Sequence, residues 1–145
     1  MANRAVRFAL TAALAALLSS PRNTIAQIGS SPASPRRVFA GRYPLLAHLA
    51  GADGDVHLVA QVSPQGSVRS VRVESGVGLL IEPAKAMLSR WIFGPCEAQG
   101  CEVPVTFHFV LEAGMCENSD CPTEVQVDLP ATVTIRSKHR PAIVN

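Results

Sequence analysis

The sequence predicts an α+β domain, in which two helices pack on a three-stranded antiparallel sheet and the C-terminal tail adds one or two further strands. Two patterns predict this fold. Apolar residues recur at helical spacing around 43–49 and 79–91, and they alternate with polar residues around 56–62, 68–74 and 103–111. Turn signals rich in Gly and Pro separate these stretches. The chain has 145 residues, of which 48% are apolar and 17% charged, which fits one globular domain with extensions.

Residues 1–26 have the layout of a secretory signal peptide. Arg4 and Arg7 precede an apolar run over residues 8–18, and small residues precede a cleavage site after Ala26. The run is shorter than the ~20 residues that a membrane-spanning helix needs. We therefore expect an exported protein, with a retained N-terminal anchor as the alternative.

Removal of this signal changes the charge balance. The whole chain has 13 Lys and Arg residues and 11 Asp and Glu residues. Arg4, Arg7 and Arg22 leave with the signal, so 10 basic and 11 acidic residues remain and the net charge becomes −1. Because nucleic-acid binding needs a basic surplus, this composition predicts no nucleic-acid partner.

Residues 27–42 are rich in Ser, Pro, Gly and Arg, a composition typical of a short flexible linker. The domain is predicted to begin at Tyr43 with a helix over 43–49. Pro44 suits the first turn of that helix, where its missing N–H leaves no hydrogen bond unmade.

A β-hairpin and a second helix are expected next. The two alternating runs, 56–62 and 68–74, flank a short turn that contains Pro64 and Gly66. The second helix is expected over 79–91, with a proline in its first turn. The inner faces of these elements and the aromatic residues after the helix form the predicted core, namely Val56, Leu58, Val62, Val71, Val73, Leu80, Ala84, Leu88, Trp91 and Phe93.

The clearest strand of the sequence covers residues 103–111. Connection rules place it beside the first strand of the hairpin, which makes it an edge of the sheet. An open edge presents unpaired backbone N–H and C=O groups that can accept another strand. The alternative is that a strand-like run of the tail (112–145), either 123–129 or 131–137, covers this edge. The predicted partner-binding residues are Val103, Val105, Thr106, Phe107, His108, Phe109 and Val110.

The four cysteines of an exported chain predict disulfides. Three pairings are open, and the two Cys-x4-Cys spacings favour Cys96–Cys101 and Cys116–Cys121, since each can close a turn. Free or mixed thiols and a four-thiolate zinc site are the alternatives.

The sequence predicts no catalytic centre, no cofactor and no metal site. The histidines, His48, His57, His108 and His139, lie on separate elements without metal-ligand spacing, and the chain has neither a Gly-x-Ser-x-Gly motif nor a phosphate-binding glycine loop. We therefore expect a protein that is not an enzyme. An exported enzyme with an unfamiliar site is the alternative from another class.

An ordered set of motifs over about residues 43–111 resembles the C-terminal domain of the TonB family. The set runs through Tyr43-Pro44, Gly54-Asp55-Val56, Gly66, Val68, Val71, Val73, Ser75-Gly76, Leu80, Ala84, Trp91-Ile92-Phe93-Gly94-Pro95, Phe107 and Phe109.

The resemblance implies a periplasmic module that pairs by strand addition with a short extended segment of an outer-membrane receptor or transport partner. The alternative is a membrane-retained component of a TonB-type energy-transducing transport system. The cleavable N-terminus and the linker of about 16 residues, which spans at most ~55 Å, depart from the anchored transducers with their long Pro-rich spacers. An open edge also allows strand-exchanged homodimers.

Overall fold

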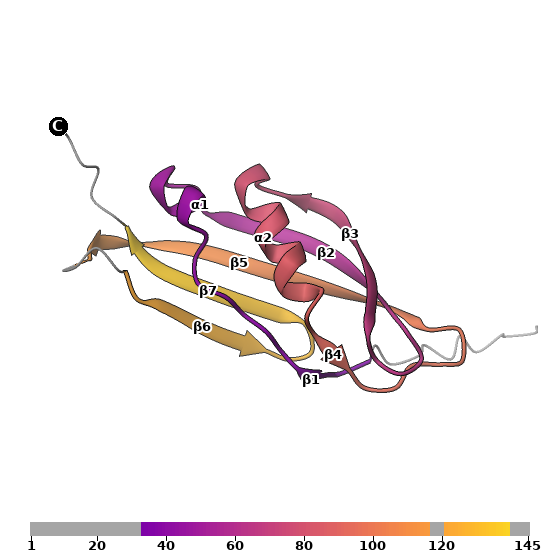
Figure 1. Cartoon of the computed structure of the whole chain (residues 1–145). Coiled ribbons are helices and arrows are strands. Elements are labelled where there is room, and N and C mark those ends of the chain that lie inside the picture. Colours follow the sequence, from indigo (N-terminus) through magenta and orange to yellow (C-terminus); the bar gives the residue numbers. More distant parts are fainter. Residues whose placement is uncertain (1–32, 117–120, 140–145) are drawn as a thin grey trace, which may run out of the picture.

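The computed structural model describes residues 33–116 and 121–139, so the predicted signal peptide lies outside the described residues. Figure 1 shows the described elements in chain order. They are β1 (Pro35–Arg37), α1 (Leu45–Leu49), β2 (Gly54–Val62), β3 (Val68–Gly76), α2 (Gly78–Leu88), β4 (Ile92–Phe93), β5 (Cys101–Met115), β6 (Thr123–Asp128) and β7 (Thr132–His139).

Five of these strands form one sheet in the order β3-β2-β5-β7-β6. Neighbouring strands are antiparallel, except that β5 and β7 run parallel. The predicted α+β class and the predicted order of the first three strands are therefore correct. The sheet has five strands rather than three because both strand-like runs of the tail join it.

The prediction that residues 103–111 form an open edge is wrong, because β5 lies between β2 and β7. Phe107 of β5 has Val133 of β7 as its register partner, and Phe109 has Ile135. All four of these side chains are buried. The tail covers β5 because Val133 and Ile135 of β7 are removed from water when β7 lies beside the aromatic residues of β5.

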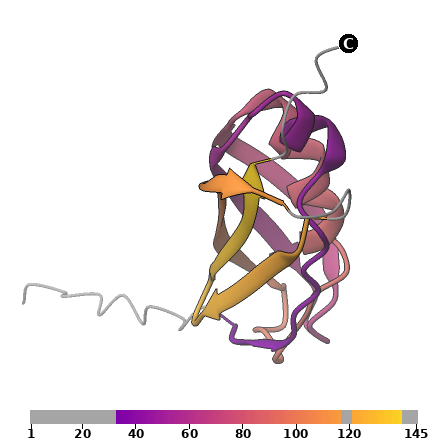
Figure 2. The ribbon, with the colours of Figure 1, turned by 90° about the vertical axis from the view of Figure 1, so that its left-hand side faces the viewer.

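The fold has two layers, since both helices cover the same face of the sheet (Figure 2). Alternate residues of β5 point to this face, and Val103, Val105, Phe107 and Phe109 are buried there. The opposite face of the sheet is mostly polar, although it includes the buried Val59, and it carries pairs such as His57 with Thr106 and Asp55 with His108.

Residues 33–42 lie against the domain, which corrects the expectation of a flexible linker for that part of 27–42. β1 pairs with β4, and the chain then crosses the helical face of the sheet in front of β7 before it enters α1 (Figure 1). The indole Nε1 of Trp91 donates a hydrogen bond to the carbonyl oxygen of Phe39 at 2.9 Å. The guanidinium of Arg90 lies 3.5 Å from the centre of the Phe39 ring.

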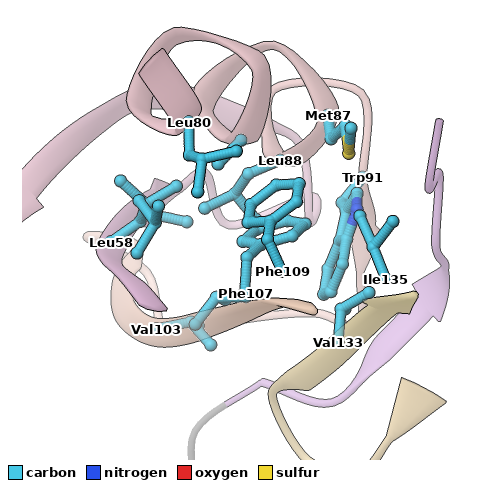
Figure 3. Packing of buried hydrophobic residues seen from close by; sticks show 14 of the residues in the cluster. Leu58, Leu80, Met87, Leu88, Trp91, Val103, Phe107, Phe109, Val133 and Ile135 are labelled. Carbon is cyan, nitrogen blue, oxygen red and sulfur yellow. The ribbon is translucent and has the colours of Figure 1, made fainter. Parts of the chain in front are cut away.

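The core is centred on Trp91, which extends from the end of α2 toward the sheet (Figure 3). Its ring centre lies 5.8 Å from that of Phe93 and 6.0 Å from that of Phe107. Val133 and Ile135 of β7 belong to the same buried cluster. Trp91, which follows the end of α2, thus packs on β5 and β7.

Two details differ from the expectations for the core. Val73 is 36% exposed and Val71 only partly buried, because β3 is an edge strand that the helices cover incompletely. Pro83 lies inside α2 rather than in its first turn, since the helix begins at Gly78. The other predicted core residues are buried, namely Val56, Leu58, Val62, Leu80, Ala84, Leu88, Trp91 and Phe93.

Candidate protein-interaction edge

The backbone of β5 has little capacity left for a partner strand. From Thr106 to Glu112 each residue pairs with β7, and from Cys101 to Phe109 each pairs with β2. The residues before Thr106 have no partner on the β7 side among the strands that the structure describes. The predicted site residues Thr106, Phe107, His108 and Phe109 therefore lie between two strands, whereas Val110 pairs with β7 and has no register partner on β2.

Pro104 blunts the short open part of β5. The N–H of Thr106 donates to the carbonyl oxygen of Ala131 at 2.9 Å, so this residue directs its backbone toward β7. Alternate residues of a strand direct their backbone groups to the same side, so Pro104 and Glu102 face the open side as well. Because Pro104 has no N–H, the N–H of Glu102 is the one donor left on the open side. The backbone groups of Val103 and Val105 face β2 instead.

The sheet ends at two true edges, β3 and β6. The pairing of β3 with β2 is interrupted by two register shifts, one between His57 and Leu58 and one between Gln61 and Val62. Arg69 and Arg72 also lie on β3. Bulges and charged side chains are devices that protect an edge from a further strand.

The β6 edge is regular and carries apolar side chains. All six of its residues pair with β7 without a register shift. Val125 and Val127 are partners of the buried Ile135 and Val133, so they point to the same face as the core. They are nevertheless 39% and 38% exposed, because no strand lies beyond them among the described residues. An incoming strand could cover both valines while it pairs with the β6 backbone.

The opposite face of β6 is acidic and holds Glu124, Gln126 and Asp128. The amide of Gln126 donates to the Asp128 carboxylate at 3.0 Å and accepts from Arg136 at 3.4 Å. Arg136 also lies 3.9 Å from Glu112 of β5. A hollow of about 180 Å³ opens near these groups, lined by Glu112, Pro122, Thr123, Glu124, Arg136, Ser137 and Lys138.

Sequence reasoning found β6 as a strand but did not identify it as the candidate edge. Its alternation of valines with Glu124, Gln126 and Asp128 is typical of a strand with one apolar and one polar face. That pattern says nothing about the order of strands, which depends on where the tail pairs.

The cysteines form the two pairs that the spacing favours, Cys96–Cys101 and Cys116–Cys121. The two disulfides lie at opposite ends of β5, on the order of 45 Å apart at ~3.3 Å per residue. This separation excludes the alternative of one four-thiolate zinc site.

The histidines do not converge on a common site. His57 contacts Thr106 at 3.1 Å and His108 contacts Asp55 at 2.5 Å, both on the polar face of the sheet. His48 is buried at the end of α1 beside Cys116 and Cys121.

Neither α1 nor α2, the helices of the described part of the chain, is long and apolar enough to cross a membrane. Comparison with protein families matches residues 40–111 to the C-terminal domain of the TonB protein of Gram-negative bacteria. No curated protein and no solved structure gave a significant match. Domains of this family act in protein interaction, in the cell envelope. The matched part of this chain, from β2 through most of β5 with both helices, therefore belongs to the TonB C-terminal domain family.

Proposed function

We propose that this chain is a periplasmic protein-binding module that accepts an extended segment of an envelope partner at β6. The observation that carries the proposal is the regular six-residue pairing of β6 on one side only. Family membership supports protein binding as the activity. Main-chain hydrogen bonds along β6 would supply affinity, and contacts to Val125 and Val127 would supply specificity.

Addition at β6 is favoured over displacement of the tail from β5. A segment that replaced β7 would first have to expose Val133 and Ile135, both at 0% exposure. Exposure of such side chains costs ~1.5–3 kcal/mol each, besides the backbone hydrogen bonds between β5 and β7. Addition at β6 breaks no contact within the sheet.

The β6 surface favours a partner segment in which apolar residues alternate with Lys or Arg. Directly opposite side chains on neighbouring strands interact, and like charges in such positions are unfavourable. The apolar face of the segment would meet Val125 and Val127, whereas its other face would meet Glu124 and Asp128. Pairing of two β6 strands from two copies would bring these carboxylates together, which disfavours a homodimer through this edge.

The place of this module in the envelope follows from the predicted signal peptide. Cleavage after Ala26 would release the domain into the periplasm, where a periplasmic segment of an outer-membrane transport protein is the expected partner. Retention of residues 1–26 would instead make the chain a membrane-held component of such a system. Mass spectrometry of the mature protein separates the two, because the first residue is Gln27 in one case and Met1 in the other.

Site-specific photo-cross-linking in the producing cells tests the binding edge. A benzophenone amino acid replaces Asp128 at the end of β6, Arg72 on β3 or Thr106 on β5 in three separate variants. We expect an adduct with an envelope protein from position 128 and none from position 106. Adducts from position 72 alone, or from none of the three, would contradict the β6 assignment.

A pair of proline substitutions then tests whether the backbone carries the binding. Adjacent residues of a strand direct their N–H groups to opposite sides. Because β7 bonds to β5 through Ala131, the backbone of Thr134 faces β6, and so its partner Gln126 directs its N–H toward β7. Gln126→Pro therefore removes a donor toward β7, and Val125→Pro removes a donor toward the open side. The open-side variant should keep the free energy of unfolding and lose the adduct from position 128. If the adduct survives in both variants, strand addition is not the mode of binding.

A further inference from the structure

The structure brings His48 next to the Cys116–Cys121 disulfide, and we propose that reduction of this disulfide creates a binding site for Zn²⁺. One ligand atom from each of the three residues lies within 4.8 Å of the others. Two thiolates and one imidazole are ligands that Zn²⁺ prefers, and the Cys-x4-Cys spacing lies within the range found in zinc sites. With three protein ligands, the fourth coordination position would hold water.

His48 is fixed in place by contacts that do not involve the cysteines. It is 5% exposed, and its Nε2 lies 2.7 Å from the carbonyl oxygen of Lys138, to which it donates a hydrogen bond. The ring also packs edge to face on Tyr43, with 5.7 Å between the ring centres. A buried imidazole with a fixed orientation needs little rearrangement to become a ligand.

The two cysteines reach the same point from different strands. Cys116 follows the end of β5 and Cys121 precedes β6, and the Cys116 Sγ lies 3.5 Å from the same Lys138 carbonyl oxygen that His48 contacts. This carbonyl oxygen therefore lies close to both the imidazole and the sulfur. In the oxidised protein the disulfide joins the two strands, and in the reduced protein the metal ion would join them.

The chemistry balances with a dithiol as reductant. The dithiol gives two electrons and two protons to the Cys116–Cys121 bond, which yields two thiols and leaves the reductant as its cyclic disulfide. Zn²⁺ then binds both sulfurs and releases two protons. The neutral imidazole of His48 would bind through its unprotonated ring nitrogen, so it adds no further proton to the balance.

The second disulfide serves as an internal control. Cys96 and Cys101 lie at the other end of β5, and within residues 33–116 and 121–139 only the group at His48 assembles three metal-ligating side chains. Reduction of Cys96–Cys101 should therefore create a pair of thiols with no comparable affinity.

Titration with Co²⁺ and Zn²⁺ under anaerobic, reducing conditions tests the site. We expect one Co²⁺ per reduced chain, with thiolate-to-cobalt charge-transfer absorption and the strong visible bands of a tetrahedral ion, and no such spectrum for the oxidised chain. The double variant Cys96→Ser, Cys101→Ser should behave like the unmodified protein. The double variant Cys116→Ser, Cys121→Ser should lose the spectrum.

The variant His48→Gln separates a ligand from a packing residue. Glutamine can still donate to the Lys138 carbonyl, so circular dichroism of the oxidised variant should stay unchanged. Its Zn²⁺ affinity should fall by more than the ~10–100-fold that loss of a residue next to a ligand costs. Unchanged affinity in this variant overturns the proposal. So does the absence of a cobalt spectrum in the reduced chain, or a reduced chain that unfolds and is not refolded by Zn²⁺.

Discussion

Phe107 of β5 and Val133 of β7 are register partners in parallel strands, and both side chains are fully buried at 0% exposure. This pair shows that the C-terminal tail is a structural part of the sheet. The tail occupies the side of β5 that the first three strands alone would leave open. The two outer strands of the described sheet are therefore β3 and β6, and the tail itself supplies β6.

The register partners Ile135 and Val125 give a direct test of how firmly the tail is held. Ile135 is buried at 0% exposure, whereas Val125 on the neighbouring β6 is 39% exposed. We expect Ile135→Ala to lower the free energy of unfolding by ~2–5 kcal/mol and Val125→Ala to lower it by less than ~1 kcal/mol. Urea unfolding followed by tryptophan fluorescence measures both. Equal small effects would mean that β7 is not docked on β5.

Trp91 should be the residue whose loss is most costly. It is 1% exposed, and its indole holds the Phe39 carbonyl. Trp91→Ala should cost ~3–5 kcal/mol. Trp91→Phe keeps an aromatic ring but leaves the carbonyl of Phe39 without its donor, at a cost of ~1–3 kcal/mol.

Thermal unfolding monitored by circular dichroism measures the stability of both Trp91 variants. Leu129→Ala is the control, because the Leu129 side chain is 69% exposed. A Trp91→Phe variant as stable as the parent would show that the contact with Phe39 contributes nothing.

Gly66 and Gly78 form a matched pair of glycines. Gly66 has a φ of +97°, its carbonyl accepts the Phe93 N–H at 2.8 Å, and an added Cβ would overlap the Phe93 carbonyl oxygen. Gly66→Ala should therefore destabilise the protein by more than 1 kcal/mol, on the order expected for a strained backbone position.

Gly78 opens α2, and a Cβ there meets nothing within 4 Å. We expect Gly78→Ala to be neutral or to stabilise by ~0.4–1 kcal/mol. Denaturant midpoints measure the stability of the two variants, and the opposite order would show that the turn between β2 and β3 does not pack on Phe93 as described.

The single tyrosine predicts a loss of stability in alkali. Burial, with a smaller contribution from the charge of Asp53, raises the pKa of Tyr43 to about 12, above its ordinary value of 10.0. The neutral phenol, which donates to the Ala52 carbonyl at 2.7 Å, is thus the form that the fold favours. The contribution of Tyr43 to the free energy of unfolding is complete below pH 10. It decreases as the pH rises toward 12, by up to ~1.4 kcal/mol per pH unit.

Tyrosinate absorbance reports Tyr43 directly, because the chain has one tyrosine. Unfolding curves across this pH range should show the loss in the parent protein and not in Tyr43→Phe. If Tyr43 titrates near pH 10 in the folded protein, its burial against α1 and β5 is not as described.

The sequence by itself determined the longer helices and strands and the local chemistry, but not β1 or β4. Alternation identified β2, β3 and β5, helical spacing identified α2, and the close cysteine spacing favoured the pairs that form. The ordered motifs around Trp91 and Phe107 were sufficient for the family, which the comparison confirmed. These features depend on neighbours within a few residues, where the period of the backbone fixes which side chains share a face.

Only the tertiary structure decided which strands are edges and which distant residues meet. Val133 and Ile135 have the same alternation whether β7 covers β5 or lies elsewhere. Their burial beside Phe107 and Phe109 fixes the position of β7, and this burial is visible only in the folded structure. His48 lies far along the chain from Cys116 and Cys121, so no spacing rule could join them. Contacts of this kind depend on how apolar faces pack, which is a property of the whole fold.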